Sequence, residues 1–183
     1  MRRAVTCLLV GLALASCGGK GASGPGTTYP AYTGHPTELF DDGIDPIAVG
    51  YQLEPGPPPA TDAKLRERVQ TADAVVRAKV TTVTSKKEDV GRSWQLGLHL
   101  LGRLAGTGGV ENDFSLDVES TDQGAGMVKA FEANLVGATF VVFGRTFAKA
   151  GAPGEAELHF HLSADKPDVL DAIKQAALLQ QVR

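Results

Sequence analysis

An alternation of apolar and polar residues, recurring from residue 74 onwards, constrains the fold most strongly. Between residues 93 and 101 every second residue is apolar, and residues 114–118 repeat the pattern. Residues 74–83 and 155–162 alternate in the same way, and residues 139–147 (TFVVFGRTF) form a strongly apolar stretch. A repeat of two places alternate side chains on opposite faces of a strand. Five strands are therefore expected, with residues 139–147 at the centre of the sheet.

Three other segments have the spacing of helices. A short helix is expected over residues 62–71, and Thr61 can cap its N-terminus. Apolar residues at helical spacing predict a second helix over residues 125–135. The chain ends in a third helix, for which Asp165 is the expected N-cap and Pro167 lies in the first turn.

The expected order from residue 74 is strand, strand, strand, helix, strand, strand. This order resembles the five-stranded OB-type barrel, whose helix lies between the third and fourth strands. The last helix is similar to the flanking helices of netrin-like and metalloproteinase-inhibitor-like variants, although those normally carry disulfides that this chain lacks. The expected fold is α+β and mainly antiparallel β. It is either an OB-like barrel or a curled sheet that does not close, with a short helix before it and a helix after it.

The first twenty residues carry a different signal. Met1-Arg2-Arg3 is a basic start, residues 4–14 are apolar, and Leu14-Ala15-Ser16-Cys17 follows. This arrangement is typical of a secretory signal, and its apolar run is shorter than the roughly 20 residues that span a bilayer. The tetrapeptide resembles the lipobox of bacterial lipoproteins. The resemblance implies cleavage before Cys17 and lipid on its thiol, which would anchor the protein in a membrane of the cell envelope. A signal peptide cut elsewhere is the alternative.

The same resemblance bears on location. The two residues after the cysteine, Gly18 and Gly19, are not the aspartate that keeps lipoproteins in the inner membrane of some Gram-negative bacteria. We therefore expect the outer membrane. The sequence indicates neither the leaflet nor the oligomeric state.

Composition divides the chain into four parts. Residues 1–16 are the expected signal peptide, and residues 17–36, rich in Gly, Pro, Ser and Thr, are the expected lipidated cysteine and flexible tether. Residues 37–60 hold scattered apolar residues and are expected to dock on the core, with an edge strand over 46–53. Residues 61–183 are expected to form a single β-rich domain.

Charge and cysteine count exclude several classes of site. Loss of residues 1–16 removes two of the 18 basic residues and leaves 16 against 21 acidic residues, a net charge of −5. A chain of this charge has no general attraction for nucleic acid, so no nucleic-acid partner is expected. Cys7 lies in the leader and Cys17 is the lipidated residue. No thiol is then left for a disulfide, a thiolate metal site or catalysis.

The last predicted strand holds the strongest candidate for a metal site. Glu155, Glu157, His159 and His161 would share one face of residues 155–162, with apolar residues on the other face. Two imidazoles flanked by carboxylates can hold a divalent metal such as zinc, and the candidate ligands are His159, His161 and Glu157. The simpler interpretation is that this face of the strand meets solvent. No cofactor is predicted.

The remaining motifs are weaker candidates. Asp41-Asp42-Gly43-Ile44-Asp45 holds three carboxylates without the alternation of a calcium loop, and we interpret it as a solvated turn. Residues 102–109 are Gly-rich but match no phosphate-binding motif, so a hairpin loop is expected there. The nucleophile motif GxSxG and the zinc motif HExxH are absent. No catalytic residue is assigned, and an enzyme is not expected.

Three functional hypotheses remain. The first is a non-enzymatic binding or assembly module that engages another envelope protein through an exposed sheet edge or apolar patch. The second is a lipoprotein that binds a small ligand in the barrel, or a divalent metal on the strand face of Glu155, Glu157, His159 and His161. The third is a hydrolase with an unrecognised site. The first is favoured, because the chain is small, tethered and without catalytic motifs.

Overall fold

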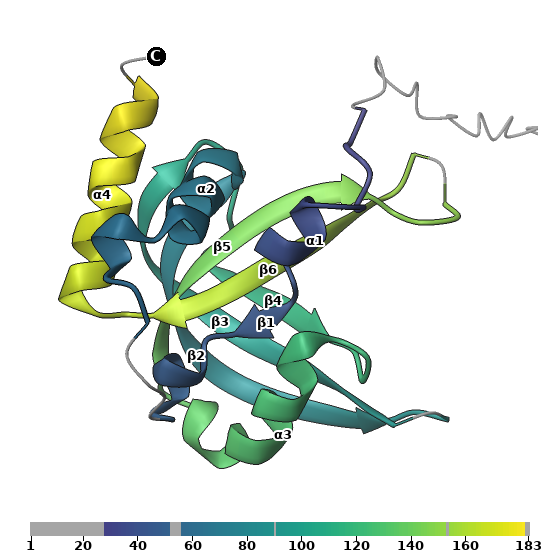
Figure 1. The fold of residues 1–183 in the computed structure, drawn as a ribbon. Helices are drawn as coiled ribbons and strands as arrows, with labels where there is room; N and C mark the ends of the chain where they lie inside the picture. The colour runs from purple at the N-terminus through teal and green to yellow at the C-terminus, as the bar shows by residue number, and fades with distance from the viewer. Residues whose placement is uncertain (1–27, 52–55, 90, 153, 182–183) are drawn as a thin grey trace, which may run out of the picture.

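The computed structural model describes residues 28–51, 56–89, 91–152 and 154–181 (Figure 1). The expected signal peptide, and Cys17, which is expected to carry lipid, lie outside these residues. The described chain forms one six-stranded curled sheet with four α-helices around it, so the α+β, mainly antiparallel prediction is confirmed.

All five predicted strands are present, and a short sixth strand precedes them. The strands are β1 (Gly43–Ile44), β2 (Ala74–Lys87), β3 (Arg92–Gly106), β4 (Asp113–Val118), β5 (Thr139–Ala148) and β6 (Ala156–Ala164). Two of them run further than expected, because β2 continues through residues 85–87 and β3 through residues 102–106. β2 and β3 pair along one long hairpin, from Lys87 opposite Arg92 to Ala74 opposite Gly106.

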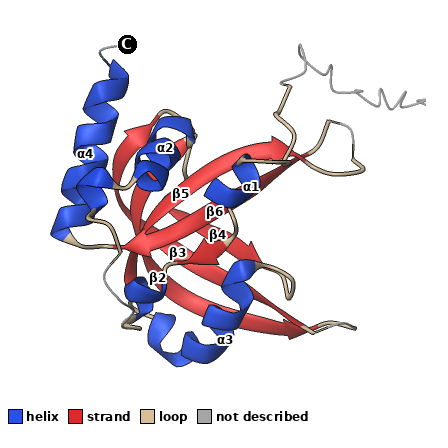
Figure 2. Cartoon of the chain, viewed as in Figure 1, coloured by secondary structure: helices blue, strands red, loops and turns tan. Residues whose placement is uncertain are grey.

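The sheet does not close into a barrel. Its strand order is β1-β6-β5-β2-β3-β4, so β1 and β4 are the two edges within the described residues. All neighbouring pairs are antiparallel except β1 and β6, which run parallel. Figure 2 shows the resulting half-barrel, and of the two folds expected from the sequence it is the curled sheet that forms.

Each face of the sheet carries a buried core, packed against different helices, and the face opposite α3 (Gln123–Leu135) is exposed over much of β3 and β4. One face packs with α3, and its core includes the alternating apolar residues of β2 and β3. The other packs with α2 (Ala63–Thr71) and α4 (Pro167–Gln181), which lie together in Figure 1. The large side chains that are fully buried include five phenylalanines: Phe40, Phe140, Phe143, Phe147 and Phe160. Burial of each stabilises the fold by about 1.5–3 kcal/mol.

The predicted helices form, but two of their caps differ. The Asp62 side chain, in place of that of Thr61, accepts hydrogen bonds from the first turn of α2. Thr61 ends a short 3-10 helix, η2 (Pro59–Thr61), and its hydroxyl donates to Pro58 O. The Asp165 carboxylate, expected to cap α4, instead accepts two hydrogen bonds from Arg77, at 2.9 and 2.6 Å.

The chain before β2 departs most from expectation. The edge strand predicted over 46–53 is wrong for its described part, because Pro46–Val49 is a 3-10 helix, η1, that ends at Gly50 with a positive φ of 84°. A proline cannot donate to a strand ladder, which disfavours a strand there. The real pairing comes just earlier, at β1. A short helix, α1 (Pro36–Leu39), precedes it.

The expected tether, residues 17–36, is packed on the sheet over part of its length. Ala31 forms a parallel bridge to Ala148, and the Ala148 N–H donates to Pro30 O at 2.9 Å. The tether expectation is therefore corrected for residues 30–36. Residues 17–27 lie outside the described part of the chain.

Two glycines of α3 test how that helix is anchored. The Gly124 N–H donates to Asp42 O at 3.1 Å, and a Cβ on Gly124 would collide with the same oxygen. We expect Gly124→Ala to lower the free energy of unfolding by about 1–3 kcal/mol. Gly126→Ala, in open space on the same helix, should raise it by up to about 1 kcal/mol. Urea denaturation measures both, and equal stability of the two variants would contradict the contact.

Candidate functional site

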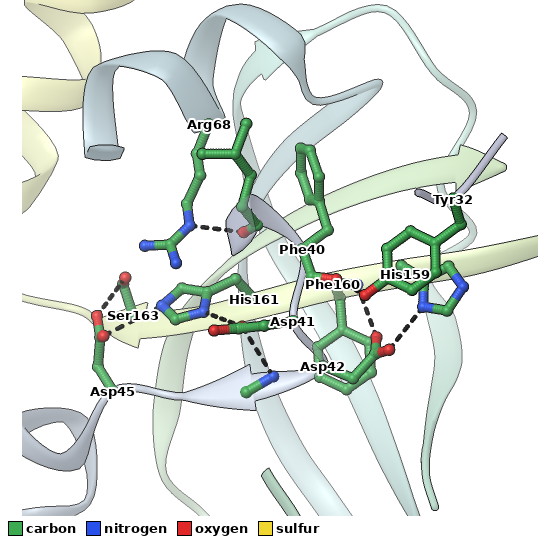
Figure 3. A network of polar contacts seen from close by, with 12 residues as sticks. Tyr32, Phe40, Asp41, Asp42, Asp45, Arg68, His159, Phe160, His161 and Ser163 are labelled. Carbon is green, nitrogen blue, oxygen red and sulfur yellow. Dashed lines mark hydrogen bonds and ion pairs between the residues drawn. The ribbon is translucent and has the colours of Figure 1, made fainter. Parts of the chain in front are cut away.

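The site lies where residues 41–45 cross β6. In the parallel pairing Gly43 is opposite His161 and Ile44 is opposite Leu162. Two backbone hydrogen bonds hold the ends of the crossing, from Asp42 N to Phe160 O at 2.9 Å and from Asp45 N to Leu162 O at 2.8 Å. Figure 3 shows that this crossing places three aspartates beside the histidines of β6. We call Asp41, Asp42, Asp45, His159, His161 and Ser163 the Asp–His network.

Asp42 holds the first histidine. One of its carboxylate oxygens lies 2.6 Å from His159 Nδ1, and the other accepts the Phe160 N–H at 2.9 Å. The Tyr32 ring stacks on the His159 ring with centroids 3.4 Å apart and an interplanar angle of 9°. The Tyr32 hydroxyl donates to Phe40 O. The imidazole of His159 is therefore held at its edge and on one face.

His161 is held from both sides of its ring. Nδ1 lies 2.7 Å from Asp41 Oδ1, and Nε2 lies 3.1 Å from Asp45 Oδ1. The second oxygen of Asp45 accepts the Ser163 hydroxyl at 2.5 Å. Only 5% of His161 is exposed, so these two carboxylates replace the water that the ring would otherwise contact.

Proximity of opposite charges shifts the pKa values in this network. Burial opposes the charged form of both histidines, but hydrogen bonds to Asp42 and to Asp41 and Asp45 outweigh it, so the pKa of each histidine is raised. Burial likewise opposes ionisation of Asp41 and Asp45, yet the hydrogen bonds and charge of His161 lower the pKa of both carboxyls. His161 and its two carboxylates, Asp41 and Asp45, therefore favour each other's charged forms.

This geometry corrects two interpretations made from the sequence. The face of β6 that carries His159 and His161 is not solvent-facing, because residues 30–46 cover it. Asp41 to Asp45 do not form a solvated turn, since Asp42 is only 7% exposed. The sequence does contain the complementary set of three carboxylates and two imidazoles. What it lacks is any local sign that the two segments meet.

The predicted metal ligands are only partly brought together. Glu157 lies 3.3 Å from His159 Nε2, whereas both ring nitrogens of His161 contact aspartates. His99, on β3, pairs with Asp113 at 2.8 Å. In the part of the chain that the structure describes, no group of three or more His, Cys, Asp or Glu is arranged to hold a metal ion. The zinc site of His159, His161 and Glu157 stays a prediction.

A cleft lies next to the network, where β4 and β6 fail to meet. It has a volume of about 410 Å³ and runs between residues 115–119 and residues 156–159, and we call it the seam cleft. Its ionisable residues are mostly acidic: Asp42, Asp117, Glu119, Asp122 and Glu157, against Lys149 and His159. Burial, and then the negative charge of Asp42 and Glu119, raises the pKa of Asp122. The crowding of carboxylates makes this cleft favourable for a cation.

The Gly-rich residues 102–109 do not form a separate loop. Residues 102–106 belong to β3, and the segment turns close over Asp73, whose carbonyl oxygen accepts the Gly108 N–H at 2.8 Å. A Cβ on Gly106, whose φ is 77°, would collide with this same oxygen. The glycines are explained by this close approach.

No family model, curated protein or solved structure matches the chain. Among the described helices, none has the length and apolar character needed to cross a membrane.

The shifted pKa values predict how stability depends on pH. A raised histidine pKa stabilises the fold fully below about 6.5, the unfolded value, and this contribution is lost as pH rises through the folded pKa. The lowered pKa values of Asp41 and Asp45 stabilise above about 4, the unfolded value, and are lost as pH falls. Stability should therefore be greatest between about pH 4 and 6.5 and fall towards pH 9, as urea denaturation across this range would measure.

Two variants test whether this dependence of stability on pH comes from the Asp–His network. His159→Gln should flatten the loss of stability above about pH 6.5, because it removes one of the titrating groups. His99→Gln, at an exposed ring outside the network, should leave the pH profile as in the unmodified chain. Identical profiles for the two variants would contradict the assignment.

Proposed function

We propose that this chain is a lipid-anchored lipoprotein of the bacterial cell envelope that binds another envelope protein and has no enzymatic activity. The leader and the Leu14-Ala15-Ser16-Cys17 tetrapeptide support the anchor, and Gly18 and Gly19 favour the outer membrane. The binding role has support of a different kind, from the shape and charge of the described sheet.

The binding role rests on the gap between β4 and β6, where the sheet stays open. Within the described residues β4 pairs with β3 alone, and β1 pairs with β6 only at His161 and Leu162. The first half of β6 and the outer side of β4 thus keep free backbone edges that face one cleft. Unpaired strand edges are templates for an added strand from another chain.

The charge of the seam cleft indicates the kind of strand that fits. Five carboxylates against Lys149 and His159 give a net charge of about −3 when the histidine is protonated. A partner segment with Lys or Arg side chains would offset the repulsion between carboxylates, which adds to burial in raising the pKa of Asp122. Leu158, which is 47% exposed, adds an apolar contact in the same cleft. The fitting partner is an extended, basic segment of another envelope protein.

The anchor is tested by the lipidated cysteine. In a bacterium that expresses the chain natively, we expect labelled palmitate to enter the protein, and the protein to fractionate with the outer membrane. Cys17→Ser should abolish the label and move the protein out of the membrane fraction, because the thiol that carries the lipid is gone. A labelled Cys17→Ser protein, or an unlabelled parent, would contradict the anchor.

The seam cleft is tested by removing its charge. In-cell crosslinking of the lipidated protein, with mass spectrometry of the products, should identify a dominant envelope partner. The double variant Asp117→Asn and Glu119→Gln should reduce that crosslink about three- to tenfold, because two exposed carboxylates are lost from the cleft.

A matched variant controls for net charge. Asp89 and Asp171 are exposed residues outside the cleft, so Asp89→Asn with Asp171→Asn removes the same charge elsewhere. This double variant should crosslink as the parent does. Absence of a reproducible partner, or equal losses in the two double variants, would overturn the proposed binding at the seam.

A further inference from the structure

A second cleft lies near the start of α4 and shares no residue with the seam cleft. It has a volume of about 550 Å³ and is bounded by η1, η2 and the first turn of α4, and we call it the arginine cleft. Its walls include the apolar side chains Ile47, Pro57, Pro58, Pro59, Leu65 and Val169. The volume is in the range of sites that hold small organic molecules.

Arg68 provides a buried positive charge in this cleft. It projects from α2 and is only 5% exposed, and its Nε donates to Leu39 O at 2.7 Å. Figure 3 shows its two terminal nitrogens pointing towards the side of Asp45 and Ser163, which also line the cleft. Those two nitrogens have no hydrogen-bond or ion-pair partner among the described residues. A negatively charged ligand group in the cleft can accept charge-assisted hydrogen bonds from these nitrogens.

The carboxylates nearest to Arg68 form their hydrogen bonds with other groups. Asp41 and Asp45 bind His161, and Asp62 caps the first turn of α2. They offset the charge of Arg68 at a distance without contacting it, and burial still lowers the pKa of the guanidinium. The guanidinium remains charged, because arginine keeps its proton in proteins. The arginine cleft therefore presents a cation whose hydrogen-bonding groups are available.

The residues around Arg68 select the charge of the ligand. A guanidinium fork matches a carboxylate in a planar, two-bond geometry. Asp45, Asp62 and Asp168 also line the cleft and repel anions, and they repel a doubly charged one such as a phosphate monoester about twice as strongly as a monocarboxylate. Lys166, exposed at the rim, adds one more positive charge. A single negative charge joined to an apolar body fits this combination.

We propose that the arginine cleft binds an organic monocarboxylate, with the carboxylate on Arg68 and its apolar part against the wall of Pro57 to Pro59. The carboxylate belongs either to a free small acid or to the C-terminus of a peptide. Both sources offer the same group to Arg68.

Calorimetric titration of the purified full-length chain in detergent tests the proposal. The probes are phenylacetate and its neutral amide, and the tripeptide Ala-Ala-Phe as the free acid and as the C-terminal amide. We expect the acids to bind and the amides to bind at least about tenfold more weakly, because the amides lose the charged hydrogen bonds. Tighter binding of phenylacetate indicates a free acid, and tighter binding of the tripeptide indicates a peptide terminus.

Variants then locate the binding in the arginine cleft. Arg68→Lys should weaken acid binding about tenfold or more, because an ammonium cannot form the fork. Ile47 lines the cleft and is 40% exposed, so Ile47→Glu adds a repelling carboxylate without disturbing the core. Ile47→Gln is its neutral match and should bind the acids more tightly than Ile47→Glu does.

The Ile47 pair keeps the proposal testable if Arg68→Lys fails to fold. Acids that bind no better than their amides, no binding of any probe, or equal binding by Ile47→Glu and Ile47→Gln would each overturn it. Retained acid binding by a folded Arg68→Lys variant would do the same.

Discussion

The parallel crossing of residues 41–45 over β6 is the contact on which the arrangement of the described structure most depends. A strand of two residues, such as β1, forms too few backbone hydrogen bonds to hold by itself. It is held because the aspartates on either side of it bond to β6. Asp42 binds both a histidine ring and a backbone N–H, and Asp41 and Asp45 enclose His161. The buried charges are tolerated because each is paired.

That crossing also explains why the sheet stays open. β1 takes the outer edge of β6 at His161 and Leu162, on the side that faces the gap to β4. It covers the second half of β6 and leaves the first half, with the opposite part of β4, as the walls of the seam cleft. α3 reinforces the crossing through the hydrogen bond from Gly124 to Asp42. The pairing of β1 with the second half of β6 thus leaves the edge of the first half of β6 free.

The same aspartates contribute to the electrostatics of both clefts. Asp42 faces the seam cleft, where it adds to the carboxylates that raise the pKa of Asp122. Asp41 and Asp45 face Arg68 but direct their hydrogen bonds to His161, which leaves the guanidinium charged and its terminal nitrogens unpaired by described residues. One cleft therefore suits a basic partner segment and the other an acid. The raised pKa values of His159 and His161 favour charged rings, which balance the charge of the acidic residues 41–45.

The amino-acid sequence by itself determined the five long strands and the order of the helices, because alternation and helical spacing depend on neighbours in the chain. It also supplied every member of the Asp–His network. Tertiary structure alone decided that the polar face of β6 is covered, since alternation shows which face is apolar but not what lies over the other. The pairing of Asp42 with His159 joins residues 117 positions apart and leaves no local pattern. Tertiary structure also decided that the barrel stays open, because closure depends on which distant segment pairs with the edge of β6.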